Sequence, residues 1–576
     1  MRKSIVLQDA YKGFTLDQDK IISPKETVQR LKEKLNTVDL DILSHTIRID
    51  NGRLDIPVYF SVCGKDAASV TGTKKQMGKG ATPEQAEASA TIELAERFSF
   101  FSFYNNPDNF IIEPYRNLND DAVPFEMIAQ SVHDESEELE LTKTIFEGLT
   151  LKWTWGFNLT QNRPLLVPFD WFYTINEFNG TSAGNCTEEA LCQGICEIVE
   201  RHVSSIISQN HLKVPLINPE SATDRLVVEM LNKYKHAGIN LIISDFSLDM
   251  GIPTVGALAY DPSTFPENSE LVWTAGTTPN PEKALSRALT EVAQLAGDFD
   301  TGSNYVSSGL PKFDSFEDIE FIINPGINTD INTLPDVSHD NIRVEVENCI
   351  SALLKKNMDI IAVDILHPLL EIPAFYTIIP GSYFRERAMG TSVGMFSAKL
   401  IAENQLPDTA VVELEKIDKM LPGKYYIKFY LGLCHISLNN LKIALNHFAQ
   451  ALDLGPTQQD IPTIYAYIGV CLKDMGEYRM ALDALEKGCR HDKGRTDIYN
   501  LMGFCHYKLK KYEKAIECFN DVIKLNPGSA IDYANIASNY RDWGKTDKAL
   551  EYYKTALAID PTINFARENL IKLKKG

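Results

Sequence analysis

The order of small, aromatic and apolar residues in the last third of the chain repeats every 34 to 37 residues. Each copy has a small residue, an alanine, a large apolar residue and a further small or apolar residue, and three copies end in proline. The copies are Gly432, Ala444, Phe448, Ala451, Pro456; Gly469, Ala481, Leu485, Gly488; Gly503, Ala515, Phe519, Val522, Pro527; and Ala537, Ala549, Tyr553, Ala556, Pro561. Small residues at such spacing let paired antiparallel helices touch, and proline ends the second helix. The pattern predicts about four helical hairpins in residues 401–576, after a helix near 408–420.

Residues 1–400 carry a different pattern, in which short strand-like runs alternate with helical stretches. Runs at 54–62, 239–244 and 359–364 are typical of β-strands. We therefore predict one large domain of the α+β (α/β-type) class over residues 1–400, followed by an all-α domain over 401–576. The charged stretch 134–144 is expected to be a surface connector.

The composition is that of a globular protein, with 44% hydrophobic and 23% charged residues among 576. The net charge of −21 is distributed unevenly, because residues 421–576 hold 22 Lys and Arg against 17 Asp and Glu, which leaves 35 against 61 in residues 1–420. A part of the chain this negative repels phosphate backbones. We therefore expect no direct binding of nucleic acid there.

The distribution of apolar residues and of cysteines indicates the compartment. Acidic residues and prolines interrupt the apolar runs, and no apolar stretch follows the first basic residues, so we expect no membrane span and no secretion signal. The ten cysteines form no Cys-x-x-Cys pair, which is typical of free thiols in a reducing cytoplasm. We interpret Cys192 and Cys196, one helical turn apart, as packed thiols rather than a redox or cluster site.

Acidic residues gather on one face of three predicted helices. Because these helices are otherwise apolar, we expect them to be buried, and buried carboxylates need cations. Because no histidine lies in the same turns, the favoured cation is Mg²⁺. Mg²⁺ takes further ligands from phosphate groups, so the expected ligand is a nucleoside triphosphate. The helices contain Ser89, Glu93, Glu96 and Arg97 after a loop at 78–81; Glu189, Gln193, Glu197, Glu200 and Arg201 after a loop at 179–185; and Arg287 with Glu291.

These motifs have three alternative interpretations. Two solvated helix faces are the simplest alternative. A P-loop does not fit, because five residues rather than four separate Gly72 from Gly78, and Gly80 replaces the required Ser or Thr. A di-iron carboxylate bundle needs Glu-x-x-His, whereas Glu197 is followed by Glu200 at that spacing and His202 comes two places later.

Taken together, these motifs resemble the YcaO superfamily over about residues 15–400, and the repeats resemble tetratricopeptide repeats. Lys20 and Thr27 resemble the opening Lys and Ser of that family, with Thr in place of Ser. The resemblance implies an ATP- and Mg²⁺-dependent enzyme that phosphorylates a backbone amide oxygen, yielding an azoline (cyclodehydratase-type) or a thioamide. It implies metal ligation by Glu93, Glu96, Glu189, Glu197, Glu200 and Glu291; nucleotide contacts from Lys20, Thr27, Ser89, Ser182, Asn185, Arg201 and Arg287; and catalytic roles for Glu93, Glu197 and Arg287.

Two departures from the family bear on the reaction. We recognise no proline-rich tail after the repeats and no peptide-clamp domain ahead of residue 20, which disfavours azoline formation on a toxin precursor. The resemblance to stand-alone bacterial members points to an accessory factor of a radical-SAM methylthiotransferase acting on a ribosomal protein. The repeats are expected to bind a substrate or partner protein, and a homodimer is left open. The alternative is a non-catalytic, nucleotide-regulated adaptor.

Overall fold

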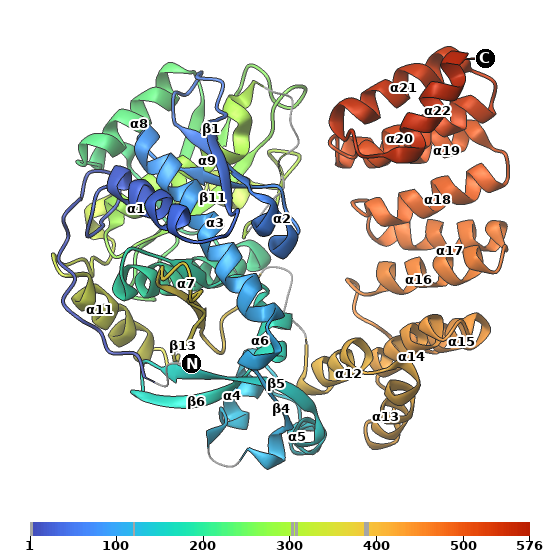
Figure 1. The fold of residues 1–576 in the computed structure, drawn as a ribbon, viewed down its shortest axis with the longest axis horizontal. Helices are drawn as coiled ribbons and strands as arrows, with labels where there is room; N and C mark the ends of the chain where they lie inside the picture. The colour runs from blue at the N-terminus through green and yellow to red at the C-terminus, as the bar shows by residue number, and fades with distance from the viewer. Residues whose placement is uncertain (1–3, 119–120, 301–304, 306–308, 385–390, 576) are drawn as a thin grey trace. The chain divides into compact units, whose positions relative to one another are not determined.

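The computed structural model describes residues 4–118, 121–300, 305, 309–384 and 391–575 (Figure 1). The chain divides into two compact units, residues 1–393 and 394–576. The boundary expected at residue 400 lies within helix α12 (Val393–Asn404). Within the described ranges, no helix is both long and apolar enough to cross a lipid bilayer.

A three-stranded antiparallel sheet, in the order β1-β2-β3, supports the first acidic helix. Thr82 caps that helix by accepting a hydrogen bond from the backbone N–H of Gln85. Gly78 allows the last strand to lie directly on the helix, because a Cβ there would be 1.9 Å from Ala90 N. The elements are α1 (Pro24–Thr37), β1 (Leu43–Arg48), β2 (Val58–Cys63), α2 (Lys65–Thr71), β3 (Lys75–Lys79) and α3 (Pro83–Asn105).

A six-stranded sheet, in the order β4-β5-β13-β14-β7 with β6 on β5, receives the other end of α3. There Phe100 contacts Phe169 and Tyr376, all of them buried. The strands are β4 (Ile111–Pro114), β5 (Thr150–Asn158), β6 (Arg163–Pro168), β7 (Thr181–Ala183), β13 (Ile361–Asp364) and β14 (Ala374–Ile378), with helices α4 (Phe125–Ser131), α5 (Leu139–Gly148) and α6 (Phe169–Asn176) in the same part of the chain.

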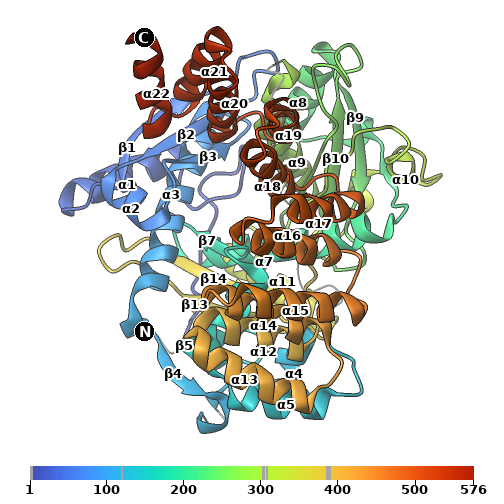
Figure 2. The ribbon, with the colours of Figure 1, turned by 90° about the vertical axis from the view of Figure 1, so that its right-hand side faces the viewer.

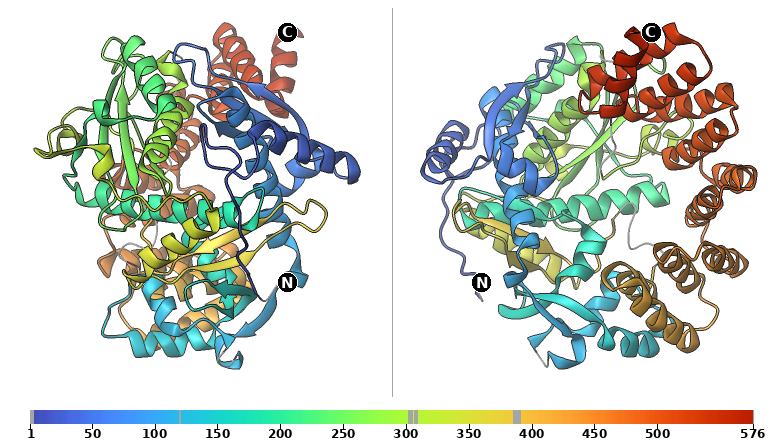
Figure 3. Two further views of the ribbon diagram at one scale, coloured as in Figure 1. Left: turned by 90° about the vertical axis from the view of Figure 1, so that its left-hand side faces the viewer. Right: turned by 45° about the vertical axis from the view of Figure 1, so that its right-hand side comes forward.

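A five-stranded sheet, in the order β11-β10-β9-β8-β12, forms the third layer, and only β8 and β12 pair in parallel. Helix α9 packs on β10 and β11, while α7 contacts both β11 and β14 and so lies between two sheets (Figure 3). The elements are α7 (Thr187–Asn210), β8 (Leu216–Ile217), α8 (Arg225–His236), β9 (Asn240–Asp245), β10 (Thr254–Tyr260), β11 (Val272–Thr277), α9 (Pro281–Ala296), α10 (Glu320–Ile323), β12 (Asn328–Thr329) and α11 (Ile342–Leu354).

The second unit is a run of helices in which consecutive hairpins pack on one another (Figure 2). Gly432 and Gly503 lie where a Cβ would come within 2.5 Å and 2.7 Å of the rings of Phe448 and Phe519, respectively. The glycines therefore let the two helices of a hairpin touch, as the repeat pattern predicts. The helices are α13 (Pro407–Met420), α14 (Tyr425–Ser437), α15 (Leu441–Asp453), α16 (Ile461–Asp474), α17 (Tyr478–His491), α18 (Thr496–Lys508), α19 (Tyr512–Leu525), α20 (Ala530–Asp542), α21 (Thr546–Ile559) and α22 (Asn564–Lys575).

The predicted connector at 134–144 was wrong in part. Helix α5 begins at Leu139 and buries Ile145 and Phe146, and Asp134 is itself buried, where it accepts a hydrogen bond from Val393 N. The prediction missed an amphipathic helix, because the buried apolar residues of α5 follow an acidic first turn.

Candidate functional site

A cavity of about 370 Å³ lies where α3, α7 and α9 meet. Its wall also includes Gln18 and Lys20 from the N-terminal segment, Thr27 from α1, Lys79 from the end of β3, and Asn185 from the loop before α7. The three helices come from different layers of the fold. The site therefore depends on the packing of the layers and not on one motif.

The structure brings together most of the residues that the sequence singled out. Ser182 and Glu200 do not contribute to the cavity wall: Ser182 is buried on β7, and Glu200 accepts a hydrogen bond from the backbone N–H of Thr277 at 3.0 Å. The predicted residues that do line the cavity are Lys20, Thr27, Ser89, Glu93, Glu96, Asn185, Glu189, Glu197, Arg201, Arg287 and Glu291.

Each of the six glutamates lies next to a basic side chain. Arg97 is 3.7 Å from Glu93 and 3.6 Å from Glu96, measured from guanidinium nitrogen to carboxylate oxygen. Arg201 is 3.8 Å from both Glu197 and Glu200. Arg287 is 3.4 Å from Glu200, Lys20 is 3.9 Å from Glu189, and Lys79 pairs with Glu291.

This pairing corrects one expectation. The sequence suggested that only bound cations could offset so many buried carboxylates, whereas five arginine and lysine side chains already pair with the six glutamates. Among the residues that the structure describes, no three His, Cys, Asp or Glu side chains are grouped closely enough to hold a metal ion. Ligation of a metal by the six glutamates therefore remains a prediction and needs several of these side chains to turn.

Burial governs the protonation of the site. It raises the pKa of Glu96 to about 8 and also raises the pKa of Glu93, in both cases against the attraction of Arg97. For Glu291, burial acts in the same direction, but Lys79 and Arg201 outweigh it and lower its pKa. Burial therefore disfavours the ionised forms of Glu93 and Glu96, which a bound cation would favour.

The donor set fits magnesium and a phosphate chain. Carboxylate oxygens are the ligands that Mg²⁺ prefers, and guanidinium groups suit phosphate oxygens. Several buried polar atoms at or beside the cavity have no hydrogen-bond partner among the described residues, as expected of groups that await a ligand. They are Gln85 Oε1, Ser182 Oγ, Glu200 Oε1, Arg201 Nε and Arg287 Nε.

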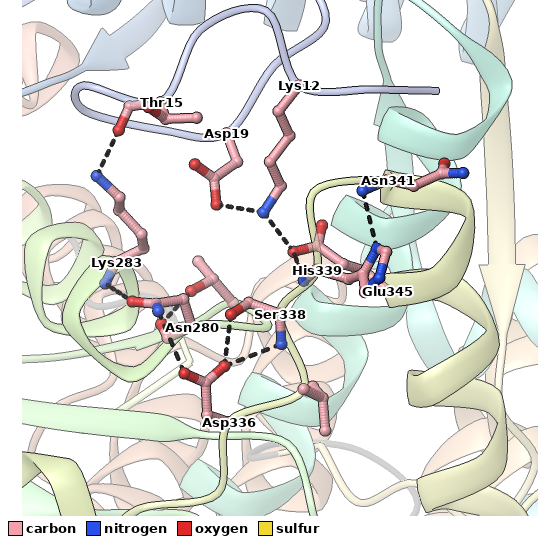
Figure 4. Close-up of polar contacts among 12 residues, drawn as sticks. Lys12, Thr15, Asp19, Asn280, Lys283, Asp336, Ser338, His339, Asn341 and Glu345 are labelled. Carbon is pink, nitrogen blue, oxygen red and sulfur yellow. Dashed lines mark hydrogen bonds and ion pairs between the residues drawn. The ribbon is translucent and has the colours of Figure 1, made fainter. Parts of the chain in front are cut away.

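The N-terminal segment is held in place by ion pairs outside the cavity (Figure 4). Lys12 Nζ lies 2.8 Å from Asp19 and 2.7 Å from Glu345 of α11, and Lys283 Nζ donates to the backbone oxygen of Thr15 at 2.8 Å. Farther along the segment, the backbone N–H of Ile21 donates to Glu189 at 2.7 Å. These contacts position Gln18 and Lys20 at the cavity wall.

Two basic residues of the site did not enter the prediction. Lys79 lies in the loop at 78–81 and Arg97 ends the motif of the first acidic helix, but neither was predicted to have a role in the site. Their roles depend on neighbours far away in sequence: Lys79 pairs with Glu291, and Arg97 donates to Thr181 Oγ1 and lies over the ring of Phe178. The signal that could have found Lys79 is its place between two glycines directly before α3.

Comparison with known proteins agrees with this geometry. Residues 77–382, more than half of the chain, match the model of the YcaO cyclodehydratase family, described as ATP- and Mg²⁺-binding. The chain belongs to the YcaO family. The expected YcaO fold and the expected cofactors, ATP and Mg²⁺, are thus those of its family, and residues 496–529 and 533–563 match tetratricopeptide repeats.

The chain is also similar to three known proteins. An uncharacterised protein of Methanothermobacter thermautotrophicus is 25% identical over 380 residues, 62% of this chain and 94% of the relative. The ribosomal protein S12 methylthiotransferase accessory factor YcaO of Escherichia coli is 28% identical over 244 residues, 38% of this chain and 40% of the relative. The structure of YcaO from Methanopyrus kandleri bound with AMPPCP and Mg²⁺ has a TM-score of 0.50 at 22% identity, covering 65% of this chain and 95% of that one.

Proposed function

We propose that this YcaO protein binds Mg²⁺ and ATP in the cavity between α3, α7 and α9 and activates a backbone amide of a peptide or protein. One observation supports the proposal: carboxylates and guanidinium groups from three helices line one cavity of about 370 Å³. When bound, Mg-ATP supplies a phosphoryl group that turns the amide oxygen into a good leaving group. The product is an azoline if a side chain adds to the amide carbon and a thioamide if a sulfide source does.

The chain's own residues divide this work by their chemistry. Glu93, Glu96, Glu189, Glu197, Glu200 and Glu291 would hold magnesium, since they are oxygen donors on facing helices. Glu200, which lies outside the cavity wall, would first have to leave the backbone N–H of Thr277. Arg201 and Arg287 would neutralise phosphate oxygens, because both are planar donors next to carboxylates that the metal would recruit. Lys20, Thr27, Ser89, Ser182 and Asn185 would contact the rest of the nucleotide, with Ser182 reached only after a local rearrangement because it is buried.

The repeats would recruit the protein that carries the amide or a partner enzyme. Similarity to the Escherichia coli accessory factor supports a partnership with a radical-SAM methylthiotransferase that acts on a ribosomal protein. The excess of basic over acidic residues in 421–576 favours an acidic partner surface. A cytoplasmic location follows from such partners.

The proposal is tested by nucleotide turnover. Purified full-length protein is incubated with ATP, Mg²⁺ and a lysate fraction of its host, and release of ADP, AMP and phosphate is measured. We expect turnover to fall at least 100-fold in Glu93→Gln and Glu197→Gln, the range for lost transition-state charge stabilisation. Glu220→Gln, on an exposed turn of the same unit, is the control and keeps full activity. Absence of nucleotide binding by the folded wild-type protein would overturn the proposal.

Mass spectrometry of proteins captured from the host identifies the product. A gain of about 16 mass units marks replacement of oxygen by sulfur, and a loss of about 18 marks ring closure. The second candidate, a nucleotide-regulated adaptor, is favoured by the ion pairs that already balance the glutamates in the structure. It predicts that Glu93→Gln and Glu197→Gln leave partner function in cells unchanged.

A further inference from the structure

Lys79 occupies a special place among the basic residues of the cavity. It is the last residue of β3, its side chain is 15% exposed, and it pairs with Glu291 of α9. Its charge also acts on Glu93 of α3 and Glu200 of α7. One ammonium group therefore interacts with a carboxylate from each of the three helices that form the site.

The backbone of Lys79 is fixed by its neighbours. A Cβ at Gly78 would lie 1.9 Å from Ala90 N, and one at Gly80 would lie 2.6 Å from Ala86 N, so both glycines press directly on α3. The flexible part of Lys79 is the four-carbon side chain alone. The ammonium group can change partners inside the cavity without movement of the strand.

The pair with Glu291 cannot persist if Glu291 turns to a metal. A carboxylate that ligates Mg²⁺ gives up much of its charge to the metal, and the nearby ammonium group loses its anion. A buried ammonium group without an anion is strongly unfavourable. In the filled cavity, where the glutamates face the metal, the phosphate chain of the nucleotide brings new negative charge within the cavity that Lys79 lines.

We propose that Lys79 is a further catalytic residue: it pairs with Glu291 in the nucleotide-free protein and contacts a phosphate oxygen when Mg-ATP binds. This inference rests on the proposed function. During transfer, a lone pair of the substrate oxygen forms the new bond to the γ-phosphorus, the bond to the β,γ-bridging oxygen breaks, and its electron pair stays on ADP. The ammonium group of Lys79 keeps its proton and offsets the negative charge of the transferring group.

The competing role for Lys79 is that of a counter-ion, needed only to neutralise Glu291. A double-mutant cycle separates the two roles. Calorimetry measures the binding of AMPPCP, once in the presence of Mg²⁺ and once in the presence of EDTA. The proteins compared are the full-length wild type, Lys79→Met, Lys79→Arg, Glu291→Gln and the double variant Lys79→Met/Glu291→Gln. Lys233→Met is the control, since Lys233 pairs with Asp55 outside the cavity.

A phosphate contact predicts weaker binding of Mg-AMPPCP by about 10- to 100-fold in Lys79→Met, the range for one lost hydrogen bond to a charged group. Lys79→Arg and Lys233→Met stay within about fivefold of wild type. The decisive comparison is the double variant against Glu291→Gln: a phosphate contact predicts a further loss of affinity, whereas a counter-ion predicts none.

Thermal unfolding of the nucleotide-free proteins supplies a readout that does not depend on ligand. Lys79→Met leaves Glu291 unpaired and lowers the unfolding temperature, and the double variant restores part of it. If Lys79→Met fails to fold, the comparison of Glu291→Gln with the double variant still decides. If the wild-type protein binds no Mg-AMPPCP, the proposed function is wrong. If Lys79→Met leaves the affinity for Mg-AMPPCP unchanged both in the wild type and in Glu291→Gln, only the inference about Lys79 is wrong.

Discussion

Thr27 Oγ1 donates a hydrogen bond to Asn185 Oδ1 at 3.0 Å and so joins α1 to the start of α7 across 158 residues of sequence. Asn185 in turn donates through its side chain to Glu189 at 2.9 Å. Two residues expected to contact the nucleotide therefore position each other, and they orient a glutamate expected to bind metal.

This link predicts a graded response at Thr27. Thr27→Ser keeps the hydroxyl and should bind AMPPCP within about twofold of wild type, whereas Thr27→Val removes it and should weaken binding by about 3- to 10-fold, as expected for one neutral hydrogen bond. Calorimetry measures both constants. Equal affinity of the valine and serine variants would show that the link does not matter for the nucleotide.

Replacement of Glu96 should stabilise the protein and impair its use of metal. Burial raises the pKa of Glu96 from 4.5 to about 8, so the folded protein holds this proton more tightly than the unfolded chain does. The folded protein therefore loses stability as pH rises from 4.5 towards 8. We expect Glu96→Gln to raise the metal-free free energy of unfolding by about 0.5–2 kcal/mol above pH 8 and to weaken the Mg²⁺ dependence of nucleotide binding. Denaturant unfolding at pH 5 and pH 9 checks the first part, with the exposed Glu84→Gln on the same helix as control.

Asp17 should make stability depend on pH between 3.8 and about 6. It is a buried residue of the N-terminal segment, where it accepts a hydrogen bond from Ala81 N at 2.7 Å, and burial raises its pKa from 3.8 to about 6. The folded protein therefore holds this proton more tightly than the unfolded chain, and wild type loses stability as pH rises through this window. The advantage of Asp17→Asn should grow by at most about 1.4 kcal/mol per pH unit there and level off above it.

Chemical denaturation between pH 4 and 8 measures this difference. Asp108→Asn, in an exposed turn, serves as the control and should track wild type at every pH. A constant gap between Asp17→Asn and wild type would mean that Asp17 does not titrate in this range.

In the repeats, the contact between Gly503 and Phe519 predicts a steric cost. A Cβ on Gly503 would lie 2.7 Å from the buried ring of Phe519, so Gly503→Ala should lower the stability of the second unit by about 1–3 kcal/mol through overpacking. At Gly528 the nearest atom is 3.5 Å away, and Gly528→Ala should be nearly neutral. Thermal unfolding followed by circular dichroism compares the two, and similar melting curves would contradict the packing argument.

Much of the fold follows from local patterns in the sequence. The spacing of Gly432, Phe448 and their counterparts predicts the hairpins because the contact it describes lies within one repeat. The acidic motifs likewise predict helices α3, α7 and α9, since capping and helical spacing act over a few residues. Helix α5, which begins at Leu139, was not predicted because its apolar residues follow a charged stretch.

The sequence by itself determined that the chain is a YcaO-like body followed by repeats, and that glutamates and arginines share helix faces. Only the tertiary structure decided which polar groups meet: Glu200 accepts a hydrogen bond from the backbone of Thr277, and Lys79 pairs with Glu291, 212 residues away in sequence. The physical reason is that helical spacing fixes a side chain's direction about its own axis. The rotation and distance of one helix relative to another come from the packing of three sheets.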